Sequence, residues 1–173
     1  MRTTPIGMVL LNDERPHVTA VNEEINQKVL RRWAQVLRDG LADGLGDPPP
    51  VVTIDSTITS VRQAQEAGET LRRAGCRSVV MCYNVWNFPF MVWPLIQTLG
   101  VDTPILSLSN NNGQFPGNVG LLATDGALRQ AGVRTQRLVG EPDDPKTCAS
   151  LLAWARAAQA RTTMQGEVYG LYG

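Results

Sequence analysis

The sequence has a single histidine, His17, and lacks the motifs that usually build a catalytic centre. A lone histidine cannot form a histidine-rich metal site, and no second ligand stands at a useful spacing from it. There is no G-x-S-x-G segment, so Ser–His or Cys–His catalysis would depend on His17 alone. The acidic residues are scattered, and no pair for acid–base work can be named. We therefore expect this chain to bind rather than react, with no catalytic residue, metal ligand or bound cofactor of its own.

Nucleotide-binding loops, long apolar runs and paired cysteines are missing as well. Neither G-x-G-x-x-G nor G-x-x-x-x-G-K-[ST] occurs, which argues against a dinucleotide site and a P-loop. No apolar run approaches the roughly 18–20 residues of a membrane span, and the first one is too short for a signal peptide. The three cysteines fit no disulfide or CxxC spacing, and the formal net charge is zero. We expect a cytoplasmic protein with no nucleic-acid or membrane partner.

The chain instead alternates short apolar runs with amphipathic segments over 173 residues, of which 43% are hydrophobic. This pattern predicts one α/β domain over residues 1–173: a doubly wound parallel sheet with helices on both faces, a three-layer α/β/α sandwich of flavodoxin-like or Rossmann-like type. Strands are expected at 5–11, 50–55, 76–83, 103–108, 134–140 and 166–173. Helices are expected at about 18–37, 60–75, 117–132 and 143–160, with an irregular, proline-marked helical segment after 83.

Two helix starts carry candidate caps. Asp143 or Asp144 is expected near the cap of the last helix, with Pro145 in its first turn. Asp55 closes the second strand, where an aspartate could serve phosphate or metal chemistry. We favour a capping role for Asp55, or for Ser56 or Thr57 beside it, at the start of the following helix.

Ligands of open α/β sheets gather beyond the carboxyl ends of the strands, so the residues found there are the candidate site. Arg15 follows the first strand and could form paired hydrogen bonds with hydroxyls or a carboxylate. The alternative is an exposed arginine that pairs with its acidic neighbours, Asp13 and Glu14, just ahead of a helix.

The third strand end combines aromatic rings with amides, in the stretch from Tyr83 to Phe90. Aromatic faces suit the C–H faces of sugars, and amides such as Asn87 suit their hydroxyls. The alternative is that Trp86 and its aromatic neighbours simply cover the sheet or an oligomer contact. The composition alone leaves both interpretations open.

The fourth strand end is the asparagine-rich stretch from Ser109 to Asn118. Asparagine and glycine tolerate left-handed backbone, so Asn110 to Gly113 is typical of a turn. Its place at a strand end also makes Asn112 and Gln114 candidate ligand contacts, close to backbone N–H groups at the start of the next helix.

Three segments together resemble the amino-terminal domain of the L-fucose isomerase family. They are IGMVLLNDERP (6–16), CYNVWNF (82–88) and PILSLSNNNGQFPGNVGLLATDGALRQAG (104–132), and the closing stretch 154–173 resembles the end of that domain. The resemblance implies an amino-terminal substrate-recognition domain of a longer, multidomain isomerase that interconverts aldoses and ketoses. It further implies Mn²⁺ whose ligands lie in other domains, and a homo-oligomer, possibly a hexamer.

In that family an arginine after the first strand and a tryptophan after the third reach into the active site of a neighbouring subunit. The matching positions are Arg15 and Trp86, and the resemblance implies that they contact the sugar. The first loop reads Asp-Glu-Arg-Pro where fucose enzymes carry Asp-Gly-Arg-Arg, so the sugar is not assigned. For the asparagine run the resemblance implies no role.

Two other functions remain open. The first is a stand-alone binding module for a sugar or similar metabolite, without catalytic activity. The second, a flavin or receiver protein, is disfavoured because Asp13, Glu14 and Asp55 make a loose acidic cluster and the chain has only two lysines, Lys28 and Lys146. This chain alone is not assigned an enzymatic activity, whereas a parent isomerase would be an enzyme.

Overall fold

The computed structural model describes residues 3–42, 47–111, 115, 117–168 and 170. Within this part of the chain, five parallel strands form one sheet in the order β2-β1-β3-β4-β5. The strands are Ile6–Leu11 (β1), Val51–Thr53 (β2), Ser78–Tyr83 (β3), Ile105–Ser109 (β4) and Thr135–Val139 (β5). The helices are Pro16–Ala42 (α1), Val61–Arg73 (α2), Trp93–Leu99 (α3), Gly117–Gln130 (α4) and Pro145–Met164 (α5), with a 3₁₀ turn at Pro89–Val92 (η1).

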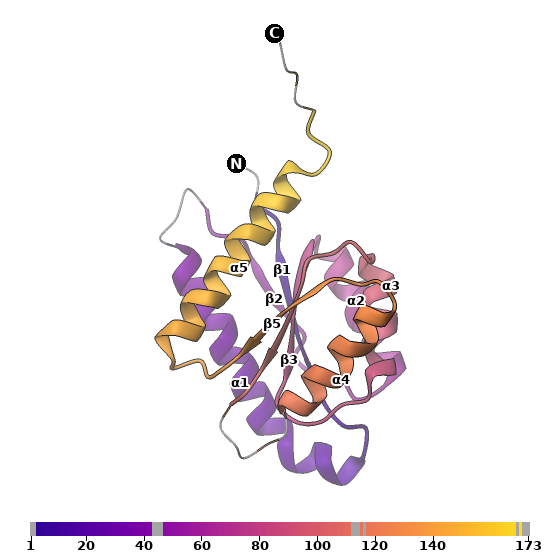
Figure 1. Cartoon of the computed structure of the whole chain (residues 1–173). Coiled ribbons are helices and arrows are strands. Elements are labelled where there is room, and N and C mark those ends of the chain that lie inside the picture. Colours follow the sequence, from indigo (N-terminus) through magenta and orange to yellow (C-terminus); the bar gives the residue numbers. More distant parts are fainter. Residues whose placement is uncertain (1–2, 43–46, 112–114, 116, 169, 171–173) are drawn as a thin grey trace.

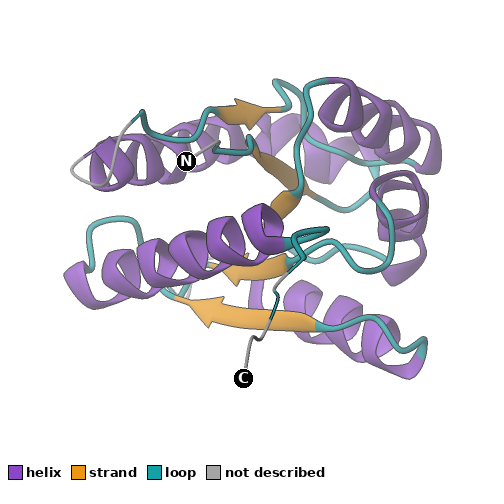
Figure 2. Ribbon diagram, turned by 90° about the horizontal axis from the view of Figure 1, so that it is seen from above, coloured by secondary structure: helices purple, strands orange, loops and turns teal. Residues whose placement is uncertain are grey.

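The sheet lies between two helical layers (Figures 1 and 2). Helices α1 and α5 cover one face, and α2, α3 and α4 cover the other, each over its own apolar cluster. The strand order is that of flavodoxin-like folds. The predicted three-layer α/β/α class is therefore confirmed.

The buried strands explain why the chain adopts this arrangement. All residues of β1, β3 and β4 are buried, as expected of parallel strands covered on both faces. Along β1, Met8 and Leu10 belong to the cluster under α1 and α5, while Val9 and Leu11 belong to the opposite one. The period of two thus divides one apolar run between two cores.

The cap of α5 is as predicted, whereas the capping residue of α2 is not, although α2 itself begins within one residue of the expected range. Asp144 caps α5 by accepting hydrogen bonds from the backbone N–H groups of Lys146 and Thr147. Ser60, rather than Asp55 or its two neighbours, caps α2. The chain stays extended beside β1 beyond Asp55, because Ile58 N donates to Leu10 O at 2.8 Å and Ile58 O accepts from Asn12 N at 3.0 Å. Because of this extra pairing, α2 begins only at Val61.

Two further expectations concern the segments after β3 and after α5. The proline-marked stretch is irregular as predicted, since η1 leads into the short helix α3. The predicted sixth strand is wrong as far as the structure describes it, because residues 166–168 and 170 form no strand and Val168 is 93% exposed. The described residues of this segment lead away from the sheet after α5, so they do not reach a strand edge (Figure 1). No helix in the described ranges is long and apolar enough to cross a membrane.

Candidate functional site at the carboxyl edge of the sheet

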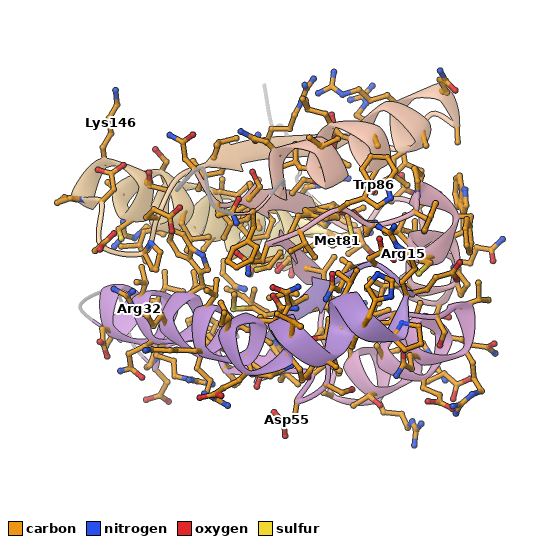
Figure 3. The ribbon with its side chains drawn as sticks, turned by 90° about the horizontal axis from the view of Figure 1, so that it is seen from below. Arg15, Arg32, Asp55, Met81, Trp86 and Lys146 are labelled. Atoms are coloured by element: carbon orange, nitrogen blue, oxygen red, sulfur yellow. The ribbon has the colours of Figure 1, made fainter. Side chains whose placement is uncertain are left out.

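The neighbouring strands β1 and β3 lead to opposite faces of the sheet. The loop after β1 enters α1 on one face, and the loop after β3 enters η1 and α3 on the other. The carboxyl ends of such a strand pair form the topological switch point, where open α/β sheets bind their ligands. We call residues 12–15 the β1 loop and residues 84–88 the β3 loop. Figure 3 looks onto this edge from below.

A row of three buried asparagines forms the floor of the switch point. Leu11, Tyr83 and Ser109 are in register across β1, β3 and β4, and each is followed by an asparagine. We call these residues the asparagine row: Asn12, Asn84 and Asn110, all buried. The Asn110 side-chain amide donates to Asn84 Oδ1 at 2.6 Å, and the Asn84 amide donates to Asn26 Oδ1 of α1 at 2.9 Å.

Amide hydrogen bonds therefore join the ends of β4 and β3 to α1, just beyond the apolar residues of the strands. Nδ2 of Asn12 and Nδ2 of Asn26 are buried and have no hydrogen-bond partner among the described residues. Buried donors without a partner cost about 1–3 kcal/mol each. The floor of the switch point is thus polar and buried rather than apolar.

In the β1 loop, a buried carboxylate holds an exposed guanidinium. Both oxygens of Asp13 accept from Arg15 Nε, at 2.9 and 2.8 Å, and Arg15 Nη2 contacts Oδ2. The backbone N–H of Arg15 adds a bond of 2.8 Å to Asp13 Oδ1. The side chain of Arg15 is 58% exposed and that of Asp13 only 1%. The hydrogen bonds from Arg15 lower the pKa of Asp13, and the same bonds raise the pKa of Arg15.

The β3 loop holds Trp86 at the margin of a small aromatic group. The Trp86 and Phe88 rings meet edge to face, with centroids 5.9 Å apart and planes at 85°, and Phe88 stacks on Phe90. Trp86 is half-buried, whereas Phe90 is exposed. An aromatic group that includes the Trp86 ring therefore follows β3, on the same edge of the sheet as Arg15.

Asn87 attaches the β3 loop to α4. Its side chain is fully buried, and its Nδ2 donates to Thr124 Oγ1 at 3.1 Å. Gly120 makes this close approach possible, because a Cβ there would lie 2.7 Å from Asn87 Oδ1 and 2.8 Å from Val85 O. The backbone on either side of Trp86 is thus fixed to a helix.

The structure brings together some of the sequence candidates and separates others. Arg15 and Trp86 follow neighbouring strands in register and lie in the same quarter of the carboxyl edge (Figure 3). Asp55 lies apart from both, exposed, with one weak hydrogen bond from Thr53. The predicted ligand contacts Asn112 and Gln114 lie outside the described residues. A substrate contact of Asn87 stays a prediction, since its amide is directed to α4.

Within the described part of the chain, no three side chains of His, Cys, Asp or Glu gather as a metal site requires. The buried carboxylate of the β1 loop, Asp13, is already paired with Arg15, and Glu14 beside it is exposed. The described residues therefore do not fit Mn²⁺. What they present at this edge is a held guanidinium, an aromatic face and buried amides.

The family profile of the first amino-terminal domain of L-fucose isomerase matches residues 3–166. The chain belongs to this family. A curated relative, the L-fucose isomerase of Bacteroides thetaiotaomicron, is 27% identical over 157 residues, which is 85% of this chain and 26% of the relative. The chain thus spans about a quarter of that relative's length.

A solved structure, the flavodoxin-like domain of a Synechococcus sp. protein, is also similar to this chain. Its TM-score is 0.49 at 16% identity, and the match covers 91% of this chain and 98% of that one. A likeness at this level adds nothing to what the strand order shows by itself.

The sequence indicates Arg15 and Trp86 as site residues, but it predicts only part of the structure that supports them. The pairing of an exposed Arg15 with Asp13 is the alternative that the sequence offers, and the structure shows this pair. The burial of Asp13 and the link between Asn26 and Asn84 have no counterpart in the sequence prediction. A signal was present, because the first, third and fourth strands are each followed directly by asparagine. Alignment of these residues depends on the strand register, which is a tertiary feature.

Proposed function

We propose that this chain is the substrate-recognition domain of a metal-dependent aldose–ketose isomerase acting on L-fucose or a similar sugar. Membership of the family carries the isomerase part of this proposal. The sugar-recognition part depends on the switch point, where Arg15 and Trp86 lie on neighbouring strand ends. In this proposal the chain binds and orients the sugar, and other parts of the enzyme react with it.

The two side chains offer complementary contacts to a sugar. The exposed N–H groups of Arg15 can donate to hydroxyl oxygens, and the Trp86 ring provides a flat face for the C–H face of the sugar ring. The polarity of the asparagine row keeps the floor below them compatible with a hydrated ligand. Asn87, Asn112 and Gln114 remain proposed secondary contacts.

The direction in which the chain leaves the sheet favours a site shared between subunits. Helix α5 runs from the carboxyl edge to the amino edge, where Gln159 Nε2 donates to Thr4 O at 2.7 Å just before β1 (Figure 1). Polypeptide that follows α5 would therefore start on the edge opposite Arg15 and Trp86. We therefore propose that a neighbouring subunit completes the site at the carboxyl edge in a homo-oligomer, with a hexamer as the family-based expectation.

The metal and the proton-transfer groups would come from outside this chain. Mn²⁺, when bound in the parent enzyme, would polarise the sugar carbonyl, while carboxylates would move the proton between adjacent carbons. This chain's own residues would hold the sugar hydroxyls, limit the orientations of the ring and cover the site against water. Under this proposal, the isolated chain has no isomerase activity.

The test compares the full polypeptide that contains this chain with residues 1–173 alone. Ketose formation from L-fucose and related aldoses is measured by NMR, with and without Mn²⁺. We expect Mn²⁺-dependent turnover from the full polypeptide and none from residues 1–173. Absence of isomerase activity in the full polypeptide, with saturable sugar binding by residues 1–173, would overturn the proposal in favour of the stand-alone binding module.

A further inference from the structure

The Arg15 guanidinium uses only one of its edges to bind Asp13. Nε donates to Oδ1 and Oδ2, and Nη2 contacts Oδ2. A guanidinium has five N–H groups in a fixed planar fork. With Nε–H and one N–H of Nη2 on the carboxylate, two N–H groups of Nη1 and one of Nη2 are left. One N–H of Nη1 and the remaining N–H of Nη2 form the end of the fork, opposite the Arg15 stem, while the second N–H of Nη1 points back toward Cδ.

We propose that Asp13 is a positioning residue that presents the Nη1–Nη2 edge of Arg15 to two adjacent oxygens of the ligand. This inference rests on the proposed function, in which Arg15 contacts a sugar. The matching group on an aldose is a pair of hydroxyls on neighbouring carbons, because two parallel N–H donors fit two oxygens a short distance apart. Asp13 thereby determines which part of the sugar Arg15 can recognise.

The burial of Asp13 distinguishes this pair from an ordinary surface ion pair. The side chains of Arg62 and Glu66 on α2 are 77% and 57% exposed, and pairs of that kind contribute little. Asp13 is buried, so its carboxylate cannot turn to solvent, and among the described residues Arg15 supplies every side-chain hydrogen bond that this carboxylate accepts.

The backbone around Asp13 is fixed as well. Its N–H donates to Asn12 Oδ1 at 2.7 Å, and its carbonyl accepts from Thr19 Oγ1 of α1 at 3.0 Å. The backbone that carries the carboxylate is therefore tied to the asparagine row through its N–H and to α1 through its carbonyl. An arginine held in advance loses less rotamer freedom on binding, which favours the bound state.

The experiment is a double-mutant cycle in the full polypeptide, with sugar turnover as the readout. The variants are Asp13→Asn, Arg15→Ala and the double variant. If Asp13 acts through Arg15, Asp13→Asn lowers kcat/KM by at least about tenfold in the wild-type background and by less than about twofold when Arg15 is already alanine. If Asp13 acts through Arg15, we also expect Asp13→Asn and Arg15→Ala to change kcat and KM in the same proportion.

Two results would contradict the inference. Wild-type kinetics for Asp13→Asn would show that Arg15 needs no positioning. An equal loss in both backgrounds would show a structural effect independent of Arg15. If Asp13→Asn does not fold, the same cycle and criteria apply to Asp13→Glu, which keeps the charge but displaces the guanidinium.

A matched control is Asp125 of α4, a buried carboxylate that accepts a hydrogen bond from Arg129 Nε at 2.9 Å and forms an ion pair with Arg137, whose Nε lies 2.8 Å from Oδ2. Asp125→Asn is expected to lower the melting temperature and leave kcat/KM within about twofold. Failure of the inference is separable from failure of the proposed function. Wild-type kinetics for Arg15→Ala would contradict the proposed contact between Arg15 and the sugar. A loss of kcat/KM in Arg15→Ala but not in Asp13→Asn would contradict only the positioning role of Asp13.

Discussion

The side-chain amide of Asn110 binds Asn84 twice, donating to its backbone carbonyl at 2.7 Å and to its Oδ1 at 2.6 Å. The two residues follow β4 and β3 directly, so one side chain joins the ends of adjacent strands. The switch point is held at its floor by these bonds, and the loops that carry Arg15 and Trp86 start from it.

Replacement of Asn110 by alanine should therefore destabilise the fold. The change leaves Asn84 Oδ1 and the Asn84 carbonyl without this donor, and we expect a loss of about 1–3 kcal/mol in the free energy of unfolding. Urea unfolding measures it. The control is Asn111→Ala, since Asn111 is exposed and its backbone N–H still donates to Glu141. Equal stability of the Asn110 and Asn111 variants would contradict this role of the asparagine row.

Two glycines of α4 should respond in opposite directions to alanine. At Gly120 a Cβ would lie 2.8 Å from the Val85 carbonyl oxygen, whereas at Gly126 it would meet nothing within 4 Å. We expect Gly120→Ala to lower stability by about 1–3 kcal/mol. Gly126→Ala should raise it by about 0.5–1 kcal/mol, because alanine favours the helix. The melting temperatures of the two variants measure both effects. A stabilising Gly120→Ala would contradict the close packing of α4 on the β3 loop.

Two of the three cysteines should be unreactive in the folded protein. Burial raises the pKa of Cys82 to about 12 and that of Cys76 to about 11, from an ordinary 9.0. Cys148, partly exposed, should be the thiol that reacts first with a disulfide reagent at pH 8. Cys148→Ser should abolish the fast phase, and a fast phase of two or more thiols would contradict the burial.

The same thiols make stability depend on alkaline pH. Because the folded-state pKa of Cys82 lies above its ordinary value, its contribution to the free energy of unfolding is complete below about pH 9. That contribution is lost as the pH rises from 9 toward 12, since only the unfolded state ionises readily there. Urea unfolding of Cys82→Ala should accordingly show a shallower decline over this range than the parent chain.

Local chemistry was predictable from the sequence, and long-range pairing was not. The start of α4 at Gly117 and the cap of α5 at Asp144 depend on nearby residues, and both were predicted. The cap of α2 was not, because the pairing of Ile58 with β1 keeps the chain extended up to Ser60. No property of residues 55–60 alone shows that β1 is beside them.

The same distinction holds for the candidate site. Arg15 and Trp86 could be named from their places after apolar runs and from the family resemblance. The buried position of Asp13 and the bond from Asn84 to Asn26 could not, because they require the packing of α1 over the carboxyl edge. Contact of Arg15 and Trp86 with a sugar remains a prediction.

The most direct measurement of the central claim is kcat/KM for sugar isomerisation by Arg15→Ala and Trp86→Ala in the full polypeptide. Arg32→Ala serves as the control, since Arg32 lies on α1 far from both residues in Figure 3. We expect each site variant to lose at least about tenfold, or about 1.4 kcal/mol, with Arg32→Ala unchanged. Wild-type kinetics in both site variants would contradict the account of this edge as the sugar-recognition surface.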